Sequence, residues 1–251
     1  MLLEGKKAVI YGGGGAIGGA VARTFAREGA RVFLAGRTLQ KLERVAADIR
    51  GAGGAADVAQ VDALDARMVD EHADAVVAAA GSLDISFNLI GHGVVQGTPM
   101  AEMDVEDYVQ PVATAVRTLF VTSRAAARHM ARGEGGVILV FGGEGDPPRG
   151  YHLGGLQTAF HAMEAMRRQL SMELADAGVR VVTLRTSGIA ETLPEDFEGR
   201  EAIVSGIDGA TLLGRSATLE DVGNVAAFVA SDRARSMTAA TANVSCGALY
   251  D

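Results

Sequence analysis

Several features that mark secreted, membrane-bound or nucleic-acid-binding proteins are scarce in this sequence. Its one cysteine, Cys246, cannot form a disulfide within the chain, and a chain of 251 residues needs no such link for stability. The formal net charge is −8 and no lysine-rich run occurs, so we expect no nucleic-acid partner. No uninterrupted apolar stretch of about 20 residues and no signal-peptide pattern are present, so we expect no membrane association. The sequence therefore predicts a soluble, cytoplasmic protein with a small-molecule substrate.

Glycine, in contrast, is abundant, with 33 residues in 251. Short β-branched runs alternate with helical patterns, which predicts an α/β fold with a parallel sheet covered by helices on both faces. We expect one domain over residues 1–251. Residues 192–214 interrupt the alternation of strands and helices and are expected to form an excursion or lid over the carboxyl edge of the sheet. Strands are expected at 7–11, 31–34, 58–61, 85–90, 137–141, 179–184 and 241–244, and helices at 16–26, 39–49, 105–130, 155–174 and 219–231.

A glycine cluster directly follows the first expected strand and opens the first expected helix. Gly12, Gly14, Gly15 and Gly18 let the chain turn at positive φ and let a phosphate approach the backbone without a Cβ in the way. The N–H groups at the start of the helix then attract a diphosphate. A plain packing turn is the alternative interpretation, but the strand–turn–helix context favours a dinucleotide site.

Two further residues lie at expected strand ends. Arg37 follows the second strand, where an acidic residue would bind the ribose hydroxyls of NAD, and a guanidinium suits the 2′-phosphate of NADP instead. We therefore favour NADP(H) over NAD(H), with a solvated arginine at a helix start as the alternative. Asp62, followed by Ala63, ends the third strand, where its carboxylate could accept a hydrogen bond from adenine or could cap a helix.

The sequence resembles the short-chain dehydrogenase/reductase family over essentially its whole length. The resemblance is carried by Tyr11-Gly12-Gly13-Gly14-Gly15-Ala16-Ile17-Gly18, Asn88-Leu89-Ile90-Gly91, Glu173-Leu174-Ala175, Gly178-Val179-Arg180-Val181 and Leu219-Glu220-Asp221-Val222. It implies a Rossmann-type, doubly wound sheet of about seven parallel strands, and a homo-oligomer, tetramer or dimer, assembled through two long helices. It also implies that Ala16, Ile17, Ala63, Asn88 and Thr192 contact the cofactor.

The same resemblance places the family's four catalytic positions on residues that lack its chemistry. Asparagine is replaced by Ala115, serine by Gly143, tyrosine by Leu156 and lysine by Phe160. Reduction of a carbonyl needs a proton donor, and loss of a general acid costs roughly 10²–10⁴-fold in rate. The family mechanism therefore cannot operate with these four residues.

Other residues could replace the missing proton donor, so the catalytic residues stay unassigned at this stage. His92, which follows the Asn88–Gly91 segment, and Tyr151, in a loop before the helix at 155–174, are the two candidates. Glu144 could be an acid or base or a solvated turn residue, and we expect no metal site.

Two hypotheses follow, and a third is weaker. The first is an NADP(H)-dependent oxidoreductase acting on a carbonyl or hydroxyl, similar to 3-oxoacyl reductases, with a non-standard proton donor. The second is a catalytically silent nucleotide-binding sensor, or an inactive subunit in a mixed oligomer with an active relative. The third is that the cofactor site itself has lost its function.

Overall fold

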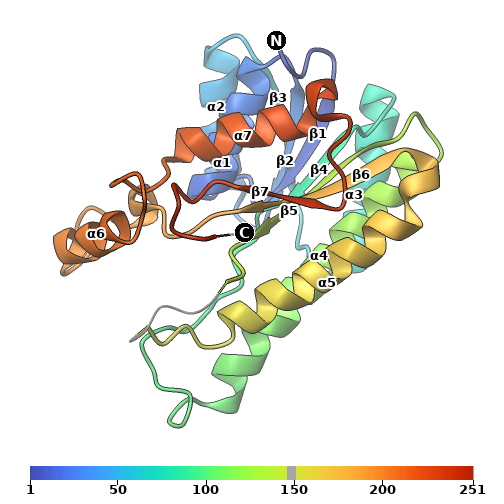
Figure 1. Cartoon of the computed structure of the whole chain (residues 1–251). Coiled ribbons are helices and arrows are strands. Elements are labelled where there is room, and N and C mark those ends of the chain that lie inside the picture. Colours follow the sequence, from blue (N-terminus) through green and yellow to red (C-terminus); the bar gives the residue numbers. More distant parts are fainter. Residues whose placement is uncertain (146–150, 251) are drawn as a thin grey trace.

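The computed structural model describes residues 1–145 and 151–250, which form one seven-stranded parallel sheet between two layers of helices (Figure 1). The strand order is β3-β2-β1-β4-β5-β6-β7, and all six neighbouring pairs are parallel. This arrangement confirms the predicted doubly wound α/β fold. The strands are β1 Lys7–Tyr11, β2 Arg31–Gly36, β3 Ala55–Gln60, β4 Ile85–Asn88, β5 Gly136–Gly142, β6 Val179–Arg185 and β7 Ala240–Asn243.

The helices divide between the two faces of the sheet, with α1, α2 and α7 on one face and α3, α4 and α5 on the other (Figure 1). Short helix α6 lies beyond the sheet edge, within the segment 192–214. The α-helices are α1 Ala16–Arg27, α2 Leu39–Gly51, α3 Ala66–Ala80, α4 Val105–Met130, α5 Leu156–Glu173, α6 Arg200–Gly209 and α7 Leu219–Ala230, and the 3-10 helices are η1 Ala175–Ala177, η2 Ala190–Thr192 and η3 Asp232–Ala234.

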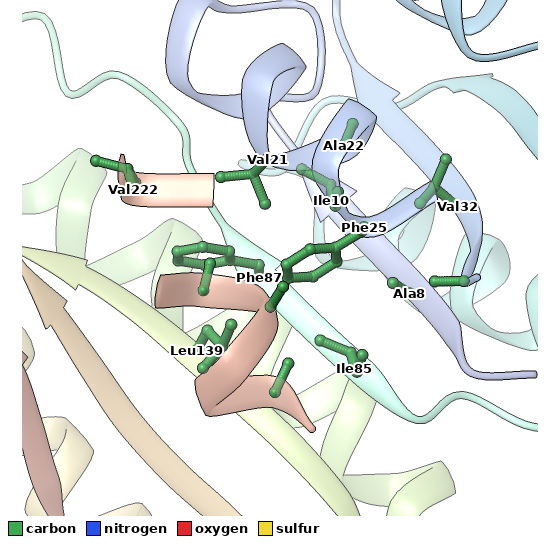
Figure 2. Packing of buried hydrophobic residues seen from close by; sticks show 14 of the residues in the cluster. Ala8, Ile10, Val21, Ala22, Phe25, Val32, Ile85, Phe87, Leu139 and Val222 are labelled. Atoms are coloured by element: carbon green, nitrogen blue, oxygen red, sulfur yellow. The ribbon is translucent and has the colours of Figure 1, made fainter. Parts of the chain in front are cut away.

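Strand residues alternate between two apolar cores, one on each face of the sheet. Ile10, Leu34 and Phe87 pack against Val21 and Phe25 of α1 and against α7, as Figure 2 shows in part. Their sequence neighbours, such as Val9 and Phe33, pack against α3, α4 and α5 instead. This period of two with both faces buried explains why the strands read as nearly continuous apolar runs.

Helix α3 was not predicted, and its composition explains why. Its buried residues Val69, Ala73 and Val76 follow helical spacing, but much of the remaining segment is alanine, which gives a weak contrast between its faces. The local signal is instead at its start, where Asp65 Oδ1 accepts hydrogen bonds from the N–H groups of Arg67 and Met68 at 2.9 and 3.2 Å. The strand before it, β3, begins at Ala55 and not at the predicted residue 58.

The order of the strands reverses between β1 and β4, and this reversal positions the site. β2 lies on one side of β1 and β4 on the other, so the loops that leave β1 and β4 diverge to opposite sides. The two strands end in register, with Tyr11 opposite Asn88. Crevices at such reversals are where open α/β sheets bind ligands.

No helix in residues 1–145 and 151–250 combines the length and apolar character that a membrane span requires.

Candidate functional site

A cavity of about 540 Å³ lies at the carboxyl ends of β1 to β4. Its floor is formed by Gly12, Gly14 and Gly15, and its walls include Arg37, Asp62 and His92. All six were singled out from the sequence. Helix α4 adds polar side chains, including Thr114 and Thr118. The strand ends and the loops that follow them thus bring the predicted binding residues together.

The glycines at the floor are needed for close packing as well as for the turn. Gly12 has a φ of +79°, and a Cβ there would overlap the carbonyl oxygen of Leu89. A Cβ on Gly14 would lie 2.9 Å from Cβ of Lys41. Gly15 is the N-cap of α1 and supplies no side-chain cap, and the first turn of this helix has no acidic residue. The free N–H groups at this helix end therefore suit an anionic ligand such as a diphosphate.

Two cationic side chains line the same cavity at the end of β2. Arg37 and Lys41 are both exposed and form no ion pair with the residues that the structure describes. The backbone of Arg37 is held by a hydrogen bond of 2.9 Å from Gln60 Nε2 to its carbonyl oxygen. Lys41 was not predicted, although its place four residues after Arg37, in the first turn of α2, was a usable signal. Together they provide two positive charges for a phosphate.

Asp62 and Ala63 line the cavity beside these cations. Asp62 Oδ1 accepts a hydrogen bond of 3.0 Å from Leu64 N–H, which fixes the turn after β3. Because Asp65 is the N-cap of α3, the alternative that Asp62 caps a helix is wrong. The carboxylate of Asp62 is thus held at the cavity wall by its own turn.

The remaining predicted cofactor contacts lie outside the lining of this cavity. Asn88 is buried, donates to Thr122 Oγ1 at 3.3 Å and accepts from Ile90 N–H at 3.0 Å, so it holds the turn after β4. Thr192 ends η2 and donates its hydroxyl to the carbonyl oxygen of Ile189 at 2.7 Å. Ala16 is exposed, whereas Ile17 packs against the core, both in the first turn of α1.

The four positions of the missing catalytic residues lie at the ends of β5 and α5 and within α4. Ala115 is fully buried in α4, and Leu156 begins α5. The ring of Phe160 lies against Gly143, since a Cβ built on Gly143 would be 3.0 Å from Cε2 of that ring. Phe160 also contacts the His92 ring edge to face, with centroids 6.3 Å apart. An aromatic ring therefore lies beside the position of the expected serine.

The two candidate proton donors differ in their relation to the cavity. His92 lines it, and burial lowers the pKa of its imidazole, so the ring is neutral at pH 7 and keeps one N–H. Tyr151 is 54% exposed, and its hydroxyl would lie 3.7 Å from a Cβ built on Gly206 of α6. His92 is therefore the better placed of the two.

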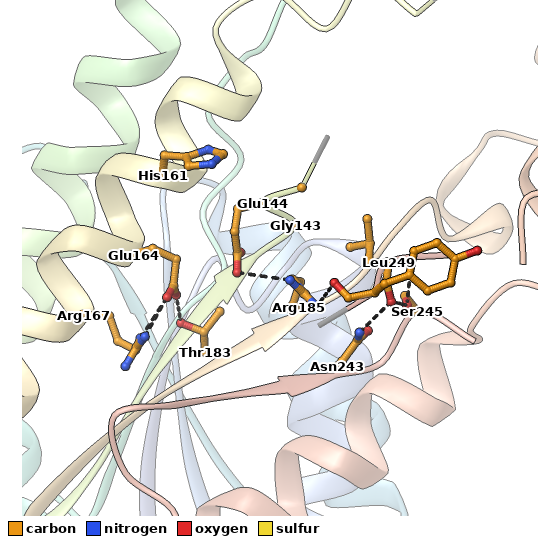
Figure 3. A network of polar contacts seen from close by, with 12 residues as sticks. Gly143, Glu144, His161, Glu164, Arg167, Thr183, Arg185, Asn243, Ser245 and Leu249 are labelled. Carbon is orange, nitrogen blue, oxygen red and sulfur yellow. Dashed lines mark hydrogen bonds and ion pairs between the residues drawn. The ribbon is translucent and has the colours of Figure 1, made fainter. Parts of the chain in front are cut away.

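Glu144, next to Gly143, belongs to a polar network beneath the start of α5 (Figure 3). Its side chain is 16% exposed and its Oε1 lies 3.7 Å from Nη1 of Arg185, so the interpretation as a solvated turn residue is wrong. Burial raises the pKa of its carboxyl group, against the opposing effects of its own backbone N–H and of Arg185. Further along α5, Glu164 pairs with Arg167 at 2.8 Å and accepts a hydrogen bond from Thr183.

Gln157, in the first turn of α5, holds the loop after β5. Its Nε2 donates to the carbonyl oxygen of Gly143 at 3.2 Å, and its Oε1 accepts from Gly145 N–H at 3.1 Å. No sequence pattern indicates this contact, because a glutamine near a helix start is common on protein surfaces. The two bonds fix the loop that carries Gly143 and Glu144.

Comparison with known proteins agrees with this geometry. A family model described as enoyl-(acyl carrier protein) reductase matches residues 14–248. The chain belongs to the short-chain dehydrogenase/reductase family. Members of this family use a nicotinamide dinucleotide as cofactor, and they catalyse oxidoreduction.

Relatives within the family are similar along nearly their whole length. The oxidoreductase asL5 of Sarocladium schorii is 32% identical over 249 residues, which cover 98% of this chain and 96% of that protein. Momilactone A synthase of Oryza sativa is 32% identical over 252 residues, which cover 93% of this chain and 86% of that protein. The structure of a short-chain dehydrogenase/reductase from Serratia marcescens superposes with a TM-score of 0.89 at 25% identity, with both chains fully covered.

Proposed function

We propose that this chain is an NADP(H)-dependent oxidoreductase of the short-chain family that acts on a carbonyl or hydroxyl group and uses His92 as its proton donor. The observation that carries the cofactor assignment is the pair Arg37 and Lys41 at the end of β2, in a cavity whose floor is a glycine turn. A 3-oxoacyl or similar carbonyl compound is the proposed class of substrate. The protein is further proposed to be cytoplasmic and to form a homo-oligomer.

The residues present fit the adenosine and diphosphate parts of the cofactor. Gly12, Gly14 and the start of α1 would hold the diphosphate, because a Cβ at either glycine would meet neighbouring atoms and the helix end carries no competing acid. Arg37 and Lys41 would bind the 2′-phosphate, and Asp62 the adenine amino group. When bound, NADPH supplies the hydride for reduction.

His92 is the residue of the cavity wall whose imidazolium form can give a proton to the substrate oxygen. Burial lowers the pKa of this imidazole, so the imidazolium is the minor form at pH 7 and a stronger acid than an exposed one. The edge contact with the ring of Phe160 orients the imidazole. In this proposal the imidazolium of His92 gives its proton to the oxygen that receives negative charge in the reduction, becomes a neutral imidazole and is reprotonated from water. This proton replaces the phenolic proton that Leu156 cannot provide.

Calorimetric titration tests the cofactor assignment. NADPH should bind at least about tenfold more tightly than NADH, and Arg37→Ala should remove most of this difference, since a charge-assisted hydrogen bond contributes about 1.5–3 kcal/mol. The matched control is Arg44→Ala, an exposed cation on α2 outside the cavity lining, which should bind NADPH as the wild type does. Equal affinity for NADPH and NADH in the wild type would contradict the proposal.

The proposed reaction is tested with a panel of ketones and 3-oxoacyl thioesters. We expect NADPH oxidation by at least one of them, and His92→Gln should reduce kcat by about 10²-fold with unchanged NADPH affinity. Tyr151→Phe is the control and should retain activity. If the protein binds NADPH but oxidises it with none of the compounds in the panel, the oxidoreductase proposal fails.

A catalytically silent nucleotide-binding protein is the second candidate, and the contact between Phe160 and Gly143 favours it. Such a protein would act as a sensor or as the inactive subunit of a mixed oligomer with an active relative. Restoring Asn, Ser, Tyr and Lys at Ala115, Gly143, Leu156 and Phe160 should then create reductase activity in a folded protein. Failure of NADPH to bind at all would instead support loss of the cofactor site.

A further inference from the structure

The cavity occupies one part of the crevice along the carboxyl edge of the sheet. Its walls come from the ends of β1, β2, β3 and β4, from the start of α2 and from α4. Within the part of the chain that the structure describes, no residue of its lining belongs to β5, β6, α5 or α6. We call the part of this cavity that is formed by the glycine turn, Arg37, Lys41 and Asp62 the adenosine end.

The other end of the crevice is covered by apolar side chains of the chain itself. Phe160 lies between the loops after β4 and β5, because its ring contacts both His92 and Gly143. A Cβ built on Gly143 would also lie 2.9 Å from the carbonyl oxygen of Thr186, so the loop after β6 closes on the same point. We call this region, around Gly143 and Phe160, the closed end.

A second apolar side chain covers the loop after β6. Ile207 of α6 packs over Gly188, where a built Cβ would lie 3.1 Å from both Cδ1 and Cγ1 of the isoleucine. The helix that carries Ile207 has no fully buried residue, so this contact attaches it to the sheet edge. Phe160 and Ile207 therefore approach the ends of β5 and β6 from two different elements.

The geometry points to a site that binds nucleotides through a 2′-phosphorylated adenosine diphosphate. A nucleotide of this kind that lacks the nicotinamide should bind as tightly as one that carries it. This inference rests on the proposed NADP(H) site and assigns its affinity to the adenosine end. Glycine N–H groups, the start of α1 and two cations are available to phosphates there. At the closed end a nicotinamide would have to displace the ring of Phe160, which offsets the contacts it gains.

Calorimetry with the intact protein tests this assignment by comparing NADPH with 2′-phospho-ADP-ribose, which lacks the nicotinamide. The two dissociation constants should agree within about threefold, whereas ADP-ribose should bind at least about tenfold more weakly and nicotinamide mononucleotide should give no heat of binding. NADPH binding more than about tenfold tighter than 2′-phospho-ADP-ribose would overturn the inference and leave the proposed NADP(H) site intact. If neither nucleotide binds, the proposed function itself fails.

A variant at the closed end supplies an independent measurement. Phe160→Ala should tighten NADPH relative to 2′-phospho-ADP-ribose by about tenfold or more, because removal of the ring frees space beside His92 and Gly143. The control, Phe228→Ala, removes a partly exposed ring from α7 on the other face of the sheet and should leave the ratio unchanged. Circular dichroism checks that both variants are folded. An unchanged ratio in folded Phe160→Ala would contradict the role of this ring.

Discussion

Burial of His72 should make the protein lose stability as the pH falls below 6.5. His72 lies on α3 against Tyr11, with ring centroids 5.9 Å apart, and burial lowers the pKa of its imidazole from 6.5 to about 4. Its Nδ1 is buried and has no hydrogen-bond partner among the described residues. The unfolded chain therefore binds a proton between pH 6.5 and about 4 that the folded chain does not bind, so stability is full above pH 6.5 and falls through this window.

The size of the effect follows from the shift. One pKa unit corresponds to about 1.4 kcal/mol, so the full shift corresponds to about 3 kcal/mol and the loss between pH 7.5 and pH 5 to about 2 kcal/mol. His72→Phe keeps an aromatic ring against Tyr11 but cannot bind a proton. The variant should therefore lose about 2 kcal/mol less stability than the wild type over this interval.

Urea unfolding followed by circular dichroism, at fixed protein concentration and at pH 7.5 and 5.0, measures this difference. Subtraction of the variant from the wild type removes the contributions of other groups, such as Glu144, whose raised pKa acts in the opposite direction. His152→Phe changes an exposed histidine and should behave as the wild type does. If the wild type and His72→Phe lose the same unfolding free energy between pH 7.5 and 5.0, to within about 0.5 kcal/mol, the reasoning is refuted.

Three further substitutions test the site and its supports. Gly12→Ala should abolish NADPH binding in calorimetry and lower the unfolding free energy by at least about 2 kcal/mol, because of its positive φ and the overlap with the Leu89 carbonyl. Asp65→Ala removes the cap of α3 and should cost about 1 kcal/mol in urea unfolding. Glu164→Ala leaves Arg167 buried without its partner and should cost about 3–5 kcal/mol, whereas replacing both residues by methionine should cost far less. Equal costs for the single and double changes would contradict this explanation.

Much of the fold could be predicted because the strands are buried on both faces. The first strand was predicted at residues 7–11, as observed, since Lys7–Tyr11 is bounded by charged residues and glycines. At β3 the prediction was less accurate, because Ala55, Ala56 and Asp57 have low strand propensity and pair through the backbone register with Arg31 to Phe33 of β2. Such pairing depends on the neighbouring strand, which local sequence patterns do not show.

The sequence could indicate which residues line the cavity where position on a strand end was enough. Arg37 and Asp62 follow neighbouring parallel strands, so both had to reach the same edge of the sheet. The contacts of Gln157 and Phe160 were not predictable in this way, because they depend on how the first turns of α5 face the loop after β5. Side-chain direction at a helix start is set by tertiary packing, which the sequence pattern leaves open.

The two ends of the crevice depend on different parts of the chain, and this explains why one can keep its form while the other changes. The adenosine end is built from backbone N–H groups and glycine turns, which few side-chain substitutions disturb. The closed end would need several polar side chains at once, since a lysine at position 160 without its partners would leave a buried, uncompensated charge. Ala115, Gly143, Leu156 and Phe160 avoid that cost together, because the ring of Phe160 packs where a side chain on Gly143 would otherwise lie. A serine at Gly143 alone should therefore destabilise the protein, and replacing the ring of Phe160 in the same variant should recover only part of the loss, because the added Cβ still meets the carbonyl oxygen of Thr186 at 2.9 Å.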